Sequence, residues 1–129
     1  MSKYLLIVDD EEGIWTSIVR KIVMHYKDAY EPLIAVDGYE ALDFMRTKDV
    51  AVAVLDLSMR NMGGLEACRI AKADAEIKDI PIIISSGFLG QYEREELERL
   101  GVEHFVDKPY TMQQLFEKID EITGFSPEE

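Results

Sequence analysis

Four charged residues follow runs of apolar residues in this 129-residue chain. Asp56 ends one such run, and the pair Asp9 and Asp10 follows another. Lys108 follows a third, shorter run. Three carboxylates that meet at one place repel one another and call for a cation, and a hard divalent ion with oxygen ligands suits them. If the fold brings the aspartates together, we expect them to bind Mg²⁺.

The elements that would position these residues alternate along the chain. Apolar runs typical of buried strands occupy residues 3–8, 32–36, 50–55, 81–84 and 104–106. Apolar residues spaced by three and four predict helices over 14–23, 38–45, 64–73, 92–100 and 111–122. Continuous apolar strands that alternate with amphipathic helices predict a parallel sheet covered on both faces. Such a sheet collects the C-terminal ends of its strands, and therefore the four charged residues, at one edge where ligands bind.

The sequence also predicts the inward face of the first helix, the end of the fourth and the start of the fifth. In the first, the residues expected to face the core are Ile14, Trp15, Ile18, Val19, Ile22 and Val23. Gly101 is expected to end the fourth helix as its C-cap, and a capping box from Thr111 to Gln114 opens the fifth. After the fifth helix, residues 123–129 read as a frayed tail.

Composition argues against several classes of protein. The formal net charge is −12, from 26 acidic and 14 basic residues, whereas nucleic-acid phosphates require clustered lysine and arginine. The same charge disfavours an anionic membrane surface, and no stretch approaches the ~20 consecutive apolar residues of a membrane span. The N-terminus lacks a signal-peptide pattern, and the single cysteine, Cys68, is expected to pack on a helix face. We therefore expect one cytoplasmic domain without direct nucleic-acid binding or membrane insertion.

The charged residues and their spacing resemble the receiver domain of two-component response regulators over essentially the whole chain. The positions that match the family's motifs are Asp9 and Asp10, Asp56, Ser86 and Lys108. The separations from Asp56 to Ser86 and to Lys108 are typical of the family. Each motif alone is common, but four in this order are specific. The resemblance implies a flavodoxin-like α/β fold, a doubly wound, five-stranded parallel sheet of order 2-1-3-4-5 with five helices.

The resemblance also implies a role for each residue of the acidic cluster. Asp56 is the phosphoacceptor. Mg²⁺ is held by Asp9 and Asp10, by Asp56 and by the backbone carbonyl of Ser58. Of the first two, Asp10 is the direct ligand and Asp9 acts through water. The ion offsets carboxylate repulsion and draws charge from the phosphoryl oxygens during an in-line transfer.

Lys108 and Ser86 complete the implied site. The Lys108 ammonium pairs with Asp56 and then with the phosphoryl group, while the Ser86 hydroxyl donates a hydrogen bond to a phosphoryl oxygen. The bond from Lys108 to Pro109 is implied to be cis. Phe105 stands at the position of the family's aromatic switch, with Ser86 as its partner in the switch. The alternative is that Phe105 is a plain strand aromatic at the sheet edge.

Two departures from the family's usual pattern bear on the site. Arg60 stands where proline is usual. Phe88, two residues after Ser86, is placed to shield the phosphoryl group from water.

The charged run at 93–99 is interpreted as a solvated helix face with charge pairs three and four residues apart, and the alternative is a partner-binding face.

The sequence thus predicts a response regulator receiver domain over residues 1–123, with a C-terminal tail at 124–129. It accepts a phosphoryl group on Asp56 from a histidine kinase or a phosphotransfer protein. It signals to a downstream protein partner through its fourth helix, fifth strand and fifth helix. It is a phosphoacceptor signalling domain that catalyses only its own phosphorylation and dephosphorylation.

Three alternatives remain open from the sequence. The receiver could be part of a larger hybrid kinase or regulator. A phosphohydrolase of the haloacid-dehalogenase type also uses an aspartate nucleophile with Mg²⁺, although that chemistry usually needs a second aspartate two residues later, where Ser58 stands. A degenerate receiver would bind its partners without phosphorylation.

Overall fold

The computed structural model describes residues 3–126, except for the side chains of residues 12 and 14. The strands are β1 (Tyr4–Val8), β2 (Glu31–Ala35), β3 (Val50–Asp56), β4 (Ile82–Ser86) and β5 (His104–Asp107). All neighbours pair in parallel, in the order β2-β1-β3-β4-β5. The predicted doubly wound sheet of order 2-1-3-4-5 is therefore confirmed.

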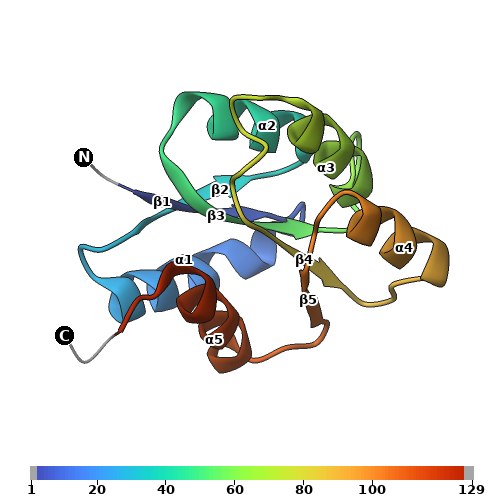
Figure 1. Ribbon diagram of the computed structural model, residues 1–129. Helices are drawn as coiled ribbons and strands as arrows, with labels where there is room; N and C mark the ends of the chain where they lie inside the picture. The colour runs from blue at the N-terminus through green and yellow to red at the C-terminus, as the bar shows by residue number, and fades with distance from the viewer. Residues whose placement is uncertain (1–2, 127–129) are drawn as a thin grey trace.

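Helices follow the strands in strict alternation. They are α1 (Glu12–Tyr26), α2 (Gly38–Thr47), α3 (Gly64–Ala73), α4 (Gln91–Arg99) and α5 (Met112–Thr123). Figure 1 shows α1 and α5 on one face of the sheet and α2, α3 and α4 on the other. All five predicted helices are present. Among residues 3–126, no helix combines the length and the apolar character that a membrane span needs.

The strands bury side chains on both faces because helices cover both. In β1, Leu5 and Ile7 belong to the core cluster that contains residues of α1 and α5, whereas Leu6 and Val8 belong to the cluster that contains residues of α2, α3 and α4. All four side chains are at most 2% exposed. Burying each of them contributes roughly 1.5–3 kcal/mol. This two-sided burial holds the C-terminal end of β1 in register with its neighbours, which is where the acidic residues follow.

Helix α1 packs through a narrower stripe than the sequence predicts. Ile18, Ile22 and Tyr26 are buried at four-residue spacing. Val23, in contrast, is 49% exposed. The prediction that Val23 faces the core is wrong, because α1 meets the sheet along one row of side chains and Val23 lies beside that row. The predicted inward position of Ile14 falls outside the described side chains.

The capping box predicted at the start of α5 is confirmed, whereas the C-cap of α4 is Leu100, one residue before the predicted Gly101. Gly101 follows α4 with φ of 91°, the left-handed conformation that glycine adopts without a steric cost. At the start of α5, the Thr111 side chain accepts a hydrogen bond from the Gln114 backbone N–H at 3.1 Å. The Gln114 side chain accepts one from the Thr111 N–H at 2.8 Å. Both contacts satisfy N–H groups that a helix start leaves unpaired.

The C-terminal segment is more ordered than the sequence predicts. Gly124 caps α5 with φ of 76°, and its N–H donates to the Asp120 carbonyl. The Phe125 ring then packs 4.9 Å from the Tyr26 ring, measured between centroids. The expectation that residues 123–129 fray is wrong as far as Phe125. Residues 127–129 lie outside the described chain, and the boundary between a receiver domain at 1–123 and a tail at 124–129 stays a prediction.

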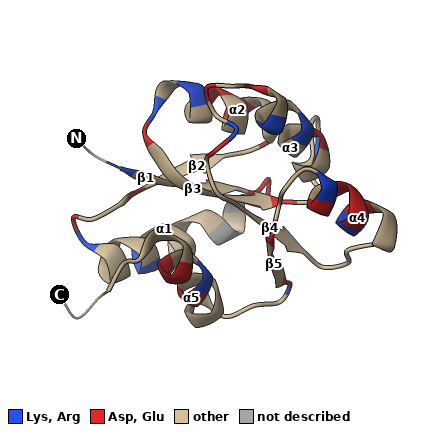
Figure 2. Cartoon of the chain, in the orientation of Figure 1, with Lys and Arg blue, Asp and Glu red and all other residues tan. Residues whose placement is uncertain are grey.

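The charged run on α4 forms ion pairs three and four residues apart, as the sequence predicts. Arg94 pairs with Glu98, and Arg99 pairs with Glu95 and Glu96. Figure 2 shows acidic and basic residues side by side on this helix. Such exposed pairs contribute about 0.3–0.5 kcal/mol each.

Candidate functional site

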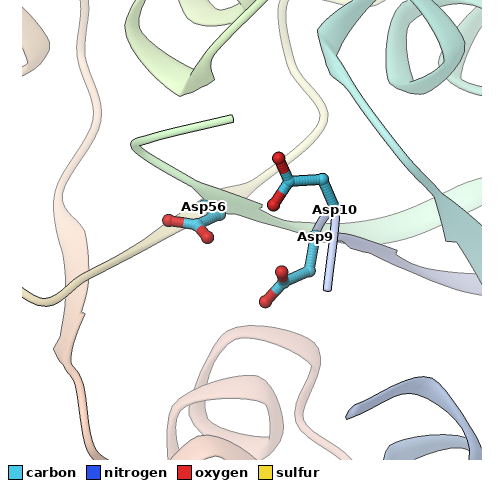
Figure 3. Close-up of side chains that lie close together, drawn as sticks. All are labelled: Asp9, Asp10 and Asp56. Atoms are coloured by element: carbon cyan, nitrogen blue, oxygen red, sulfur yellow. The ribbon is translucent and has the colours of Figure 1, made fainter. Parts of the chain in front are cut away.

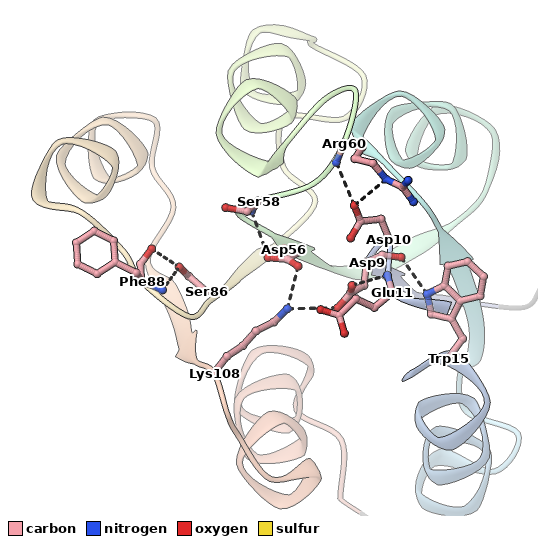
Figure 4. A network of polar contacts seen from close by, with 10 residues as sticks. All are labelled: Asp9, Asp10, Glu11, Trp15, Asp56, Ser58, Arg60, Ser86, Phe88 and Lys108. Carbon is pink, nitrogen blue, oxygen red and sulfur yellow. Dashed lines mark hydrogen bonds and ion pairs between the residues drawn. The ribbon is translucent and has the colours of Figure 1, made fainter. Parts of the chain in front are cut away.

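Asp56 is a buried carboxylate at the C-terminal end of β3. It is 7% exposed, and both of its oxygens accept hydrogen bonds (Figure 4). The Lys108 ammonium donates to Oδ2 at 2.8 Å, and the Ser58 backbone N–H donates to Oδ1 at 3.2 Å. A buried charge is costly unless it is paired, and these two contacts pair the carboxylate of Asp56.

Asp9 is the second buried carboxylate, at 5% exposure. Its Oδ1 accepts a hydrogen bond from the Glu11 N–H at 3.0 Å, and its Oδ2 lies 3.4 Å from the Lys108 ammonium. The indole N–H of Trp15 donates to the Asp9 carbonyl at 2.9 Å. These contacts place Asp9 between the start of α1 and the loop that follows β5. The sequence pattern placed Trp15 only among the apolar residues of the first helix and did not predict this hydrogen bond.

The three aspartates converge at one edge of the sheet, as the strand ends require (Figure 3). Asp9, Asp10 and Asp56 each offer a carboxylate oxygen, and these oxygens lie within 4.8 Å of one another. Mg²⁺ binds oxygens at 2.0–2.1 Å, so two ligands on opposite sides of the ion are about 4.2 Å apart. Neighbouring ligands of an octahedral ion are about 3 Å apart, so the three side chains must draw closer together to bind one ion. The cluster nevertheless has the oxygen donors and the size that suit a small divalent cation. The predicted ligand role of the Ser58 carbonyl stays a prediction.

Lys108 joins the site to β4 as well as to the acids. Its backbone N–H donates to the Ser86 carbonyl at 2.8 Å, and its bond to Pro109 is cis, as the resemblance implies. Burial by itself lowers the pKa of the Lys108 ammonium, but the hydrogen bond and charge of Asp56, with the charge of Asp9, raise that pKa above its ordinary value. The side chain therefore carries its positive charge into the site.

Ser86 ends β4 with its hydroxyl engaged by the backbone. The hydroxyl donates to the Phe88 carbonyl at 2.6 Å and accepts from the Phe88 N–H at 3.1 Å. Figure 4 shows this hydroxyl turned toward Phe88 and not toward Asp56. The Phe88 side chain is 83% exposed, so the expectation that it shields the site is wrong for this conformation. The reason is the Ser86 contact, which holds the backbone of residue 88 so that the ring points outward.

Phe105 lies in β5, half-buried against the core cluster that includes Leu97 of α4. The guanidinium carbon of Arg94 is 4.4 Å from the centroid of the Phe105 ring. This distance is typical of a cation–π contact. The ring therefore rests between the sheet and α4, and its role as a switch stays a prediction.

The loop from β3 to α3 is held down over the site by close contacts. Asn61 adopts a left-handed φ of 67°, which asparagine tolerates, and its side-chain amide donates to the Asp37 carboxylate at 3.0 Å. A Cβ on Gly64 would lie 2.7 Å from the Asp56 carbonyl oxygen, so only glycine lets the loop return this closely.

Within this loop, Arg60 contacts Asp10 twice. Its backbone N–H donates to Asp10 Oδ2 at 3.1 Å, and its Nε lies 3.6 Å from the same oxygen. Sequence reasoning identified Arg60 only as a departure from the family's usual proline. The departure was nevertheless a usable signal, because proline has no N–H and no charge.

The comparisons with known proteins decide the family. The sequence model of the response regulator receiver domain matches residues 5–120 of the chain. This chain is a member of the response regulator receiver family. The receiver domain is 32% identical over 126 residues to the chemotaxis protein CheY1 of Helicobacter pylori, with 93% of this chain and 96% of that protein covered. Membership in this family, which is one of signalling domains, overturns the phosphohydrolase alternative.

Other relatives extend the comparison. The receiver domain is 27% identical over 124 residues to the polar-differentiation response regulator DivK of Brucella ovis, covering 96% of this chain and 98% of that protein. The non-phosphorylated HemR receiver domain of Leptospira biflexa has a TM-score of 0.81 and 22% identity, with 97% of each chain covered. At that identity, the likeness to the HemR structure supports the flavodoxin-like fold alone.

Proposed function

We propose that this receiver domain accepts a phosphoryl group on Asp56 in the presence of Mg²⁺ and signals through α4, β5 and α5. The observation that carries the proposal is the surroundings of the Asp56 carboxylate. One buried nucleophile lies against the Lys108 ammonium, and it shares an oxygen cluster with Asp9 and Asp10 that fits a divalent cation. Phosphoryl transfer needs this combination of nucleophile, metal site and fixed positive charge.

The phosphoryl transfer to Asp56 is a single displacement at phosphorus. An Asp56 oxygen attacks phosphorus, the P–N bond of a phosphohistidine donor breaks as the new P–O bond forms, and the released imidazole takes up a proton from solvent. Mg²⁺ bound by Asp9, Asp10 and Asp56 would neutralise charge on the phosphoryl oxygens. Lys108 already contacts Asp56 and supplies a second positive charge. For Ser86 to donate to the phosphoryl group, its hydroxyl must leave the Phe88 carbonyl.

A groove beside the site supports a protein as the phosphoryl donor. It has a volume of about 820 Å³ and runs between the start of α1 and the loop from β5 to α5. Asp9 and Lys108 line it from the site, and Ser17, Tyr110 and Met112 from its walls. A histidine kinase or phosphotransfer protein that covers this groove would bring its histidine to Asp56. The family resemblance and the CheY1 relative support this class of donor.

The charge of the domain bears on the class of partner that it binds. Lysine and arginine residues occur on all five helices and are not gathered on one of them (Figure 2). With a formal net charge of −12, the domain is suited to protein partners and not to direct nucleic-acid binding. We therefore propose that the output is a downstream protein, and the receiver family and the CheY1 relative support a cytoplasmic location.

The test is covalent labelling by a small phosphodonor such as acetyl phosphate, followed by intact-protein mass spectrometry. We expect one added phosphoryl group that depends on Mg²⁺ and is absent in Asp56→Asn. Asp107→Asn is the matched control, since Asp107 also ends a strand but is exposed, and it should label like the parent. Full labelling of Asp56→Asn would assign the phosphoryl group to another residue, and no labelling of the parent by any donor would leave the degenerate receiver as the better reading.

A further inference from the structure

Arg60 is the cation that contacts Asp10, on the side of the acidic cluster away from Lys108. Lys108 contacts Asp9 and Asp56, whereas Arg60 contacts Asp10 through its backbone N–H at 3.1 Å and its Nε at 3.6 Å. Each of the three carboxylates therefore has a cationic partner. Figure 4 shows the Arg60 side chain folded over Asp10 on the side away from Lys108.

The Arg60 contacts belong to this chain's sequence and not to the usual receiver pattern. Proline, the usual residue at this position, can make neither contact because it lacks both an N–H and a charge. The backbone N–H fixes Asp10 Oδ2, and the guanidinium then adds a charge beside an oxygen that Mg²⁺ would also attract. A bound ion and the guanidinium cannot both be close to this carboxylate without repelling one another.

We propose that Arg60 is a counter-ion of Asp10 that weakens Mg²⁺ binding. It thereby sets the Mg²⁺ concentration at which the site can be phosphorylated. This inference rests on the proposed Mg²⁺ function of the cluster. Arg60 acts as a positioning residue, since it reaches the metal site through Asp10. Its side chain is 85% exposed and that of Asp10 is 22% exposed, so the pair is closer to a surface ion pair than to a buried one.

The exposure sets the size of the effect. Surface pairs are worth about 0.2–1 kcal/mol, which corresponds to roughly a 1.5- to 5-fold change in Mg²⁺ affinity. Because exposed charges are screened within a Debye length of about 10 Å at 0.1 M salt and about 3 Å at 1 M, the effect of Arg60 must shrink as ionic strength rises. A role in packing would not show this salt dependence.

The experiment is a Mg²⁺ titration without any phosphodonor, by calorimetry and by the fluorescence of Trp15. Trp15 is the single tryptophan, and it lines one hollow with Asp10, Arg60, Val36 and Asn61. Arg60→Gln removes the charge and keeps the N–H. We expect it to bind Mg²⁺ about 1.5- to 5-fold more tightly than the parent at low ionic strength, and equally at about 1 M salt.

Two further variants separate the local pair from net charge. Arg60→Lys keeps a cation and should bind Mg²⁺ within twofold of the parent. Arg69→Gln removes an equally paired arginine on α3, which contacts Glu96 at 3.5 Å, and should leave the affinity unchanged. The inference is overturned if Arg60→Gln binds Mg²⁺ no more tightly than the parent, or if Arg69→Gln tightens binding as much. Failure of the parent itself to bind Mg²⁺ would overturn the metal function, and this inference with it.

Discussion

The Lys108 ammonium lies 2.8 Å from Asp56 Oδ2, although the two residues are 52 positions apart in the sequence. Only the parallel sheet brings them together, since both stand at C-terminal strand ends. The contact makes Lys108 part of the electrostatic balance of the unmodified site.

Replacing Lys108 should destabilise the metal-free protein. Lys108→Met leaves the buried carboxylates of Asp9 and Asp56 without their cation, and we expect a loss of about 1–3 kcal/mol in the free energy of unfolding at pH 7. The raised lysine pKa means that this stabilisation is fully present below the ordinary lysine pKa of about 10.4. It is lost as pH rises through the raised value, so the difference should shrink only in strong alkali. Urea unfolding measures it, with Lys78→Met, at an exposed lysine, as control.

The same Lys108→Met variant should lose the structural response of α4 and β5 to a phosphoryl mimic bound at Asp56. Fluoroberyllate bound at Asp56 is expected to shift the backbone amide resonances of α4 and β5 in the parent. In the variant these shifts should be lost, because a ligand moves a two-state equilibrium only through contacts that differ between the states. Equal remote shifts in both proteins would show that Lys108 is not the coupling residue.

The Arg94 contact with Phe105 should contribute to stability as a pair. Exposed cation–π contacts are worth about 0.5–1 kcal/mol. Arg94 also pairs with Glu98 at 3.6 Å, so a single variant is ambiguous and a double-mutant cycle of Arg94→Met and Phe105→Leu isolates the coupling. We expect a coupling free energy of about 0.5–1 kcal/mol. Additive effects within error would show that the ring and the guanidinium are independent, and Arg99→Met with Phe105→Leu provides the matched additive control.

The Tyr26 hydroxyl should anchor α1 to α5. It is 1% exposed and donates to Asp120 Oδ1 at 2.7 Å, and burial together with this bond raises the tyrosine pKa, so the hydroxyl stays a donor. Tyr26→Phe should lower the free energy of unfolding by about 1.5–3 kcal/mol, the range for hydrogen bonds to charged groups. Thermal or urea unfolding measures this. Tyr39→Phe, at a 64% exposed tyrosine, should be neutral, and equal effects in the two variants would contradict the anchor.

Much of this domain is determined by its sequence alone. The alternation of apolar runs with helical periodicity predicts a parallel sheet covered on both faces, because each segment must bury its apolar side chains. The strand order 2-1-3-4-5, in contrast, was implied by the family resemblance. The position of Asp56 at a strand end then places it with Asp9 and Asp10, since parallel strands share one C-terminal edge. The capping box at Thr111 is equally local, so it too could be predicted.

Other features depend on contacts that no local pattern encodes. Periodicity identifies the inward face of α1 but not the width of its contact, so Val23 is exposed where burial was predicted. Phe125, beyond the end of α5, packs against Tyr26, the last residue of α1. The same holds for the guanidinium of Arg60 beside Asp10, because which oxygen a side chain reaches is decided only when the loop and the strand ends are packed together.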